Sequence, residues 1–315
     1  MPARKFGPGS AIGLALGLLF AVFPLFWMVS TSFKPSNEWV TVPPVWVSEN
    51  GTVTNYLVIL WPSLLLEQRG GLGQYTEEGE VTQQRATQSS SVSGAVADFL
   101  TKSAWQSIWG SVIVSVFSTM LSIVVGFMAA IAIARYRFGG NITPFFILSG
   151  RMFPPIAIAI PFVVMFSAPG IEATDTYWGL ILAYAAVTVP FSTWMLKSFI
   201  DDLPQEIEEA AMMDGMSRWE AHLKVTVPLI KGGLIATSLF IFILNWSEFL
   251  FALVLTYTNV ETIPVKLSKY FSATSGQQYG IQAALACVSI VPLVIVGFFI
   301  QKHLVRGLTL GAIKR

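Results

Sequence analysis

Long apolar runs are the feature that most limits what this chain can fold into. About twenty apolar residues are enough for a helix to cross a bilayer, and we count six runs near that length. Charged residues make up only 12% of the chain and hydrophobic residues 54%, far from the usual quarter charged. We therefore predict an all-α integral membrane protein with six transmembrane helices, at residues 11–31, 107–134, 143–167, 177–199, 233–256 and 281–301.

The first run resembles a secretory signal, because Arg4 and Lys5 precede it. The run from Ala11 to Ser30 is too long for a signal-peptide core, and no small-X-small cleavage site follows it. We therefore expect this run to be retained as the first membrane span.

Basic residues orient the predicted spans. The side that holds both termini has twelve Lys and Arg residues, whereas the other side has six despite its longer loop. The positive-inside rule then places both termini in the cytoplasm. The predicted layout is a cytoplasmic N-terminus, the first span, an extracytoplasmic loop, a core with the other five spans, and a cytoplasmic tail, at residues 1–10, 11–31, 32–106, 107–302 and 303–315.

A polar loop at residues 200–231 separates the fourth and fifth runs and has the signals of a short helix. Pro204 suits the first turn of a helix, and Asp201 and Asp202 complement the positive end of its dipole. Gly215 is placed to end that helix in a left-handed conformation. A helix inside a connecting loop indicates a role beyond joining two spans.

A second short helix follows. Ser217 and Glu220 have the spacing of a capping box, and Pro228 is expected to stop the helix. An amphipathic helix between spans can rest on the membrane surface, but small residues anchor poorly in lipid. The first helix is therefore predicted to dock in a groove of another protein through one face, formed by Ile207, Ala210, Ala211 and Asp214.

The same loop resembles a known motif. Glu209-Ala210-Ala211, three residues, Gly215, and an aliphatic-X-aliphatic-Pro ending at Pro228 resemble the Glu-Ala-Ala (EAA) loop of membrane subunits in binding-protein-dependent ABC importers. The likeness is close over residues 104–315, loose over 11–60, and absent over 62–102. Three further segments resemble the maltose-type carbohydrate permeases: Arg151 to Pro155, Asn245 to Leu253, and Leu304 to Ala312.

The resemblance implies a sugar-importer permease subunit that forms half of the translocation path in a bacterial-type inner (plasma) membrane. Its implied partners are a second related permease subunit, two copies of a cytoplasmic ATPase, an extracytoplasmic sugar-binding protein, and membrane lipid. Glu209 would be the polar anchor of the ATPase contact and Gly215 its sharp turn, and residues 307–315 would reach the same interface.

Catalysis and cofactor binding are not expected in this chain. The pattern Gly-x-x-x-x-Gly-Lys, which cradles phosphates, is missing, so ATP and Mg²⁺ would be bound by the partner ATPase and this chain would not be an enzyme. Cys287 lies alone in an apolar run, and His222 and His303 flank different runs, so we expect no metal site. No nucleic-acid partner is expected either.

Ionisable and polar groups within the runs are candidates for the translocation path or its gate. Glu248 is the strongest, with Ser247 beside it and Asn245 expected on the same helix face. Glu248 would either make an interhelical polar contact or face a watery cavity and accept sugar hydroxyls. Arg151, early in the third run, would either snorkel or pair with a carboxylate across the bundle.

Three other functions stay open, and one of them, a scaffold with no transport role, is disfavoured by the prolines within the predicted spans. A permease for polyols or glycerol 3-phosphate would need an internal cation when its substrate carries phosphate, and Arg151 is the candidate. A secondary carrier that works alone on an ion gradient would need several intramembrane carboxylates, of which the runs plainly supply only Glu248.

Overall fold

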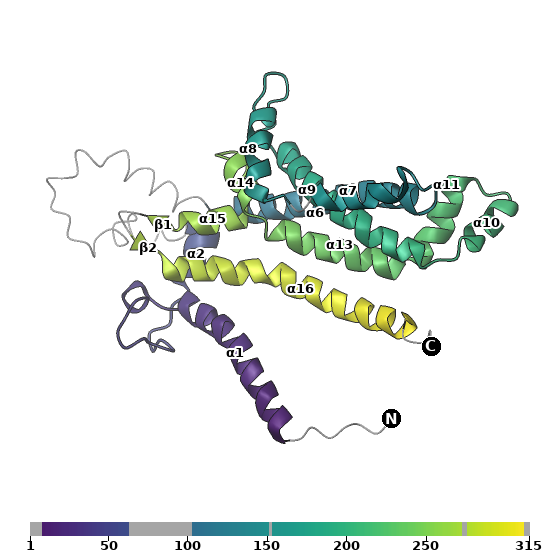
Figure 1. Cartoon of the computed structure of the whole chain (residues 1–315). Helices are drawn as coiled ribbons and strands as arrows, with labels where there is room; N and C mark the ends of the chain where they lie inside the picture. Colours follow the sequence, from purple (N-terminus) through teal and green to yellow (C-terminus); the bar gives the residue numbers. More distant parts are fainter. Residues whose placement is uncertain (1–7, 63–102, 151–152, 273–275, 312–315) are drawn as a thin grey trace. The chain divides into compact units, whose positions relative to one another are not determined.

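The computed structural model describes residues 8–62, 103–150, 153–272 and 276–311 (Figure 1). They belong to two compact units, residues 1–105 with 266–291 and residues 106–265 with 292–315. Most of the regular structure is helical, with one pair of two-residue strands. The elements are α1 Pro8–Ser32, η1 Ser36–Glu38, α2 Thr54–Leu60, α6 Trp105–Ala134, η3 Gly140–Ile142, α7 Thr143–Ser149, α8 Pro155–Phe166, α9 Tyr177–Asp201, α10 Glu206–Met213, α11 Arg218–Ala221, η5 His222–Thr226, α12 Val227–Leu229, α13 Lys231–Trp246, α14 Leu250–Leu255, α15 Ile263–Lys269, β1 Phe271–Ser272, β2 Gly276–Gln277 and α16 Tyr279–Gly311.

In the first unit, side-chain contacts stabilise the chain where α1 ends. Asn55, buried on α2, donates its amide to the carbonyl oxygens of Ser32 (3.0 Å) and Lys34 (2.9 Å). The Lys34 ammonium lies 4.0 Å from the centre of the Trp27 ring, a cation–π contact. These bonds satisfy carbonyl groups that the end of a helix leaves without partners.

The two strands are the small departure from the all-α prediction. β1 and β2 pair antiparallel, with Phe271 opposite Gln277 and Ser272 opposite Gly276. Beyond the pair, the Gln278 N–H donates to the Tyr270 carbonyl at 3.0 Å. The strands occupy the short connection between α15 and α16, where inter-strand bonding satisfies backbone groups that neither helix can.

The second unit is held by a seam of small side chains between α6 and α9. The Ser122 and Thr188 hydroxyls lie 2.7 Å apart, and Ser192 donates to the Ser122 carbonyl at 2.6 Å. A Cβ on Gly126 would collide with the Ser192 side chain. Helices pack closely in a bilayer through such residues, which recur along the buried side of α6 at Ser107, Ser111, Ser115, Ser118, Ser122 and Gly126.

Helix α13 packs along α9 in the same unit (Figure 1). Asn245, buried near the end of α13, donates its amide to the Thr119 hydroxyl of α6 at 3.2 Å. Toward α8 and α14, an apolar cluster that includes Phe166, Leu180 and Phe251 closes the unit.

Among the described residues, four helices are long and apolar enough to cross a membrane: α1, α6, α9 and α16. A fifth span results if the segment 218–229 and α13, which meet at a 79° bend, are counted together. The four long helices match the first, second, fourth and sixth predicted runs. The third and fifth runs are not single helices.

The third predicted span, 143–167, is divided into α7 and α8. Helix α8 begins at Pro155, directly after Pro154. A proline cannot donate the backbone bond that a continuing helix needs, and it also disfavours helical geometry in the residue before it. The same segment contains Arg151, which lies outside the described residues.

The fifth predicted span, 233–256, is divided into α13 and α14. Glu248 lies between them, not within one helix beside Asn245 as the sequence suggested. Its carboxylate accepts hydrogen bonds from the backbone N–H groups of Phe251 (3.1 Å) and Ala252 (3.4 Å). The side chain thus caps the first turn of α14, which makes the break possible without proline or glycine.

Asp175 ties the connection before α9 to the connection after α14. Its carboxylate accepts the backbone N–H groups of Tyr257 (2.9 Å), Thr258 (3.1 Å), Asn259 (2.9 Å) and Val260 (3.1 Å). Burial alone would raise the pKa of this carboxyl, but the four backbone donors lower its pKa to about 2.

Replacing this carboxylate should make the free energy of unfolding depend less on pH below about pH 4. Because its folded pKa of about 2 lies below the ordinary 3.8, ionised Asp175 stabilises the fold at neutral pH, and the contribution is lost as pH falls from about 4 to 2. We expect Asp175→Asn to lower the free energy of unfolding by less than about 1 kcal/mol at pH 7, because water screens the charge of this partly exposed carboxylate, and expect the difference to vanish near pH 2. Thermal unfolding of the purified protein, followed by intrinsic fluorescence between pH 7 and 2, measures this.

Glu172→Gln is the matched control, because Glu172 is an exposed carboxylate in the same connection. An Asp175→Asn protein as stable as the unchanged protein at pH 7 would show that the N–H cluster contributes nothing to folding.

Candidate functional site

Helix α10 forms where the loop signals predicted a helix. It begins at Glu206, two residues after Pro204, and ends at Met213. Its first turn carries Glu206, Glu208 and Glu209, whose charges complement the positive end of the helix dipole. A helix of eight residues is too short to be stable alone, so its position depends on contacts with the rest of the unit.

Gly215 ends α10 as predicted. Its φ is +91°, in the left-handed region that side chains with a Cβ avoid. The Gly215 N–H donates to the Met212 carbonyl at 3.0 Å, and the Met216 N–H donates to the Ala211 carbonyl at 3.2 Å. This pair of bonds is a Schellman motif, which satisfies the last carbonyls of the helix and reverses the chain.

The predicted capping box opens α11. The Glu220 N–H donates to the Ser217 hydroxyl at 3.3 Å, and the Ser217 N–H donates to the Glu220 carboxylate at 3.0 Å. The Ser217 backbone donor, with further bonds from Lys224 and the Ser217 hydroxyl, lowers the pKa of Glu220 to about 2. The start of α11 is therefore stabilised by local bonds.

Pro228 does not stop the second helix where the sequence suggested. Helical backbone runs from α11 through the π-helical turn η5 and on to Leu229 in α12, one residue beyond Pro228. The π turn bonds residues five apart. The Val227 N–H reaches the His222 carbonyl in this way, and the chain bends by 79° between the 218–229 segment and α13.

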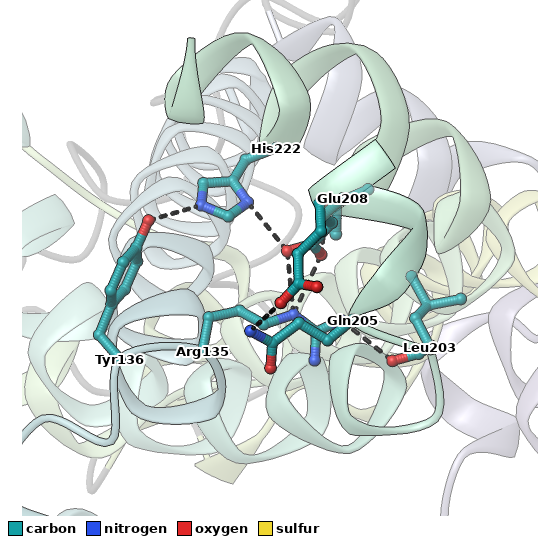
Figure 2. Close-up of polar contacts among 8 residues, drawn as sticks. Arg135, Tyr136, Leu203, Gln205, Glu208 and His222 are labelled. Carbon is teal, nitrogen blue, oxygen red and sulfur yellow. Dashed lines mark hydrogen bonds and ion pairs between the residues drawn. The ribbon is translucent and has the colours of Figure 1, made fainter. Parts of the chain in front are cut away.

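The inner side of α10 is held by a buried ion pair (Figure 2). Arg135, just past the end of α6, donates its Nε to both carboxylate oxygens of Glu208 at 3.1 and 3.0 Å. Its Nη2 donates to the Leu203 carbonyl at 3.1 Å. The Thr226 hydroxyl donates to Glu208 Oε1 at 2.8 Å. The side chains of Arg135 and Glu208 are only 8% and 6% exposed, so the pair is removed from water.

His222 extends this cluster. Its Nδ1 lies 3.6 Å from Glu208 Oε2, and its Nε2 lies 3.1 Å from the Tyr136 hydroxyl (Figure 2). Burial lowers the pKa of the imidazole; Glu208 opposes that shift and Arg135 adds to it. The net effect favours the neutral form of the imidazole.

The outer side of α10 differs from the predicted docking face in one residue. Ile207, Ala210 and Asp214 are exposed, but Ala211 is buried on the same side as Glu208. Met213, which the prediction did not include, is 88% exposed. The outer face is therefore Ile207, Ala210, Met213 and Asp214, and Glu209 is exposed next to it with a hydrogen bond from Gln205 at 3.0 Å.

Sequence reasoning singled out Glu209 and missed Glu208 and Arg135. The two glutamates are adjacent, and only the position of α10 against α6 decides which of them turns inward. The sequence did contain a signal for the inward position of Glu208, because Glu208 and Ala211 are three residues apart and share a helix face.

The candidate path residues lie away from this cluster. Asn245 is buried and bonded to Thr119, whereas Ser247 is exposed and returns its hydroxyl to the Ile243 carbonyl at 2.7 Å. Glu248 caps α14, and the Tyr184 hydroxyl donates to its backbone carbonyl at 3.3 Å. Asn245 and Glu248 therefore contact different helices.

Comparison with known proteins matches residues 122–310 to the family described as "Binding-protein-dependent transport system inner membrane component". The inner membrane ABC transporter permease protein YcjP of Escherichia coli is 31% identical over 310 residues, which cover 97% of this chain and 96% of that protein. The trehalose/maltose transport system permease protein MalG of Thermococcus litoralis is 34% identical over 204 residues, which cover 64% of this chain and 73% of that protein.

The fold is similar to that of a solved chain from a bacterial ABC transporter involved in the import of the acidic polysaccharide alginate. The TM-score is 0.67 at 20% identity, over 95% of this chain and 99% of that chain. Family, relatives and fold agree with one another, and the chain belongs to the inner-membrane permease components of binding-protein-dependent ABC transport systems.

Proposed function

We propose that this chain is the membrane-spanning permease subunit of an ATP-driven sugar importer. Relatives named as permeases for trehalose/maltose, trehalose and maltodextrin support sugar as the substrate class. The observation that carries the proposal is the α10–α11 loop, an ordered helix pair that presents small and apolar side chains outward. Its rigid construction is what a contact with a separate motor protein requires.

In this proposal the chain crosses an inner membrane six times, with α7–α8 and α13–α14 as broken third and fifth spans. Broken helices are tolerated in a bilayer where they are buried in protein or line a cavity. Both termini and the α10–α11 loop face the cytoplasm, as the distribution of basic residues favours.

The partners follow from the same proposal. A second permease subunit completes the path, two copies of a cytoplasmic ATPase bind ATP and Mg²⁺, and an extracytoplasmic protein delivers the sugar. Helix α10 seats its outer face, Ile207, Ala210, Met213 and Asp214, in a groove of the ATPase, with Glu209 as the polar contact. Closure of the ATPase dimer moves α10 as a rigid body and switches the spans between inward- and outward-facing arrangements.

The test is a mild-detergent pull-down of the tagged chain from its own membranes, with partners identified by mass spectrometry. The purified complex is then assayed in vesicles for uptake of labelled trehalose and maltose. We expect an ATPase and a second multi-span protein to be recovered, and uptake to require ATP. Recovery of the chain alone, moving solute without ATP, would instead identify a secondary carrier.

Gly215→Ala should uncouple the ATPase contact. An alanine held at φ +91° is strained by roughly 1–2 kcal/mol, which corresponds to about a tenfold shift toward other orientations of the loop. We expect ATPase retention and ATP-dependent uptake to fall by about that factor, with the protein still in the membrane. Pull-down yield and vesicle uptake measure this.

Gly170→Ala is the matched control, because Gly170 also has a positive φ, +85°, and also has open space around its Cβ position. Equal losses in the two variants would mean that general backbone strain, and not the geometry of the loop, causes the defect.

Glu248→Ala should weaken the fold more than it changes transport by each folded molecule. It would leave the Phe251 and Ala252 N–H groups without their acceptor, at about 1–3 kcal/mol. Glu248→Gln, which retains one acceptor oxygen, should recover part of that loss. Thermal unfolding and uptake per surface-exposed molecule separate the two effects.

Ser247→Ala serves as the control, because that exposed hydroxyl bonds only to its own helix among the contacts described. If stability is unchanged in Glu248→Ala while uptake per molecule collapses, the carboxylate acts on the solute instead of the helix break.

A further inference from the structure

We propose that Glu208 is the positioning residue that fixes the angle of α10 to the end of α6, so that a movement imposed on α10 reaches the spans. The role rests on the proposed function, since it treats α10 as the coupling helix. It goes further by assigning the transmission of movement to a side chain on the inner face, next to the motif glutamate Glu209 but separate from it.

The contacts of Glu208 come from two sides. Arg135 follows α6 and grips both carboxylate oxygens, while its Nη2 reaches the Leu203 carbonyl just before α10. Thr226 donates from η5, the turn that leads through α12 to α13. One carboxylate therefore links α10 to the residue that follows α6, as Figure 2 shows, and also to η5.

The chemistry of this link makes it stiff. The Arg135 Nε–H is shared between both Glu208 oxygens as a charge-assisted bond, while Nη2 is held by the Leu203 carbonyl and Thr226 bonds Glu208 Oε1, so the pair is held from three directions. The side chains are 8% and 6% exposed, so water cannot easily replace either partner when the helix tilts. Breaking one side of a buried ion pair leaves the other charge uncompensated, which strongly opposes any other arrangement.

The exposed ion pairs nearby do not have these properties. Lys224 and Glu220 are bonded four residues apart on one face, with side chains 62% and 47% exposed. Such pairs contribute little to stability, and this one connects neighbouring turns of the same segment. Among the described ion pairs of the loop, Glu208–Arg135 joins α10 to a membrane-spanning helix.

The first measurement is the orientation of α10. Spin labels at Met212→Cys on α10, which lies outside the proposed docking face, and Trp194→Cys on α9, in a Cys287→Ser background, report the distance between two exposed positions of the same unit. The measurement is made on the complex as extracted from its membranes. We expect Glu208→Gln to broaden the distance distribution and Glu206→Gln, an exposed carboxylate change on the same helix, to leave it unchanged.

The second measurement is the number of sugars taken up per ATP hydrolysed, with trehalose and maltose as the probes. We expect Glu208→Gln to lower this ratio about tenfold, as loss of a buried coupled pair permits, while the ATPase is still retained. Glu209→Gln should do the reverse, weakening ATPase retention while the distance distribution stays narrow.

A double variant, Arg135→Gln with Glu208→Gln, separates positioning from folding. It removes the uncompensated charge, so we expect membrane abundance to return to that of the unchanged protein. The uptake ratio should stay low, because the neutral amides do not rebuild the stiff link. If the double variant restores both abundance and the ratio, Glu208 is needed only for folding and the proposal fails.

Failure of the proposed function gives a different result. If the unchanged complex contains no ATPase, the coupling role of α10 is wrong, whereas the distance measurement still tests whether Glu208 positions α10. If neither sugar is taken up, the distance measurement alone tests the positioning role of Glu208. A distribution in Glu208→Gln as narrow as that of the unchanged protein overturns the positioning role whatever the partners are.

Discussion

Backbone N–H and C=O groups inside a bilayer have no water to bond with, and every departure from a straight helix must therefore supply its own partners. The breaks in this chain follow that constraint. Between α13 and α14 the Glu248 carboxylate accepts two backbone N–H groups. Connections outside the spans are closed by local bonds as well, although water could serve there: the Gly215 motif and the Ser217–Glu220 capping box satisfy the helix ends of the α10–α11 loop, and Asp175 accepts four N–H groups from a connection that forms no helix.

The same constraint explains how the spans of the second unit hold together. Apolar side chains gain little by leaving lipid for protein, so helix association depends on close approach and interhelical hydrogen bonds. The serines of α6 and Gly126 provide close approach, and Ser122, Thr188 and Ser192 provide the bonds. The proposed coupling also requires this close packing, since a displaced α10 would move the bundle only if α6 and α9 do not slide past each other.

Features that depend on one segment or on residues close together in the sequence could be predicted, whereas features that depend on distant residues could not. Run length and charge identified the helices α1, α6, α9 and α16, because lipid solvation acts on each segment by itself. The end of α10 at Gly215 and the start of α11 were also predicted, because capping depends on residues a few positions apart. The break at Glu248 was missed: no proline or glycine marks it. The identity of the inward glutamate was missed as well, since Glu208 and Glu209 differ only in which of them meets Arg135, 73 residues away in sequence.

This last difference shows why a short motif can draw attention away from a more constrained residue directly before it. Exposed Glu209 and Ala210 are available to a partner, whereas Glu208 and Ala211 are buried within the chain that carries them. A contact surface on a helix of eight residues is useful only if its orientation is specified, and an isolated helix of that length specifies nothing. The motif thus has two faces with separate physical tasks. One face is exposed and, in the proposed function, meets the ATPase, whereas the other is buried and its Glu208 is bonded to Arg135 just past the end of α6.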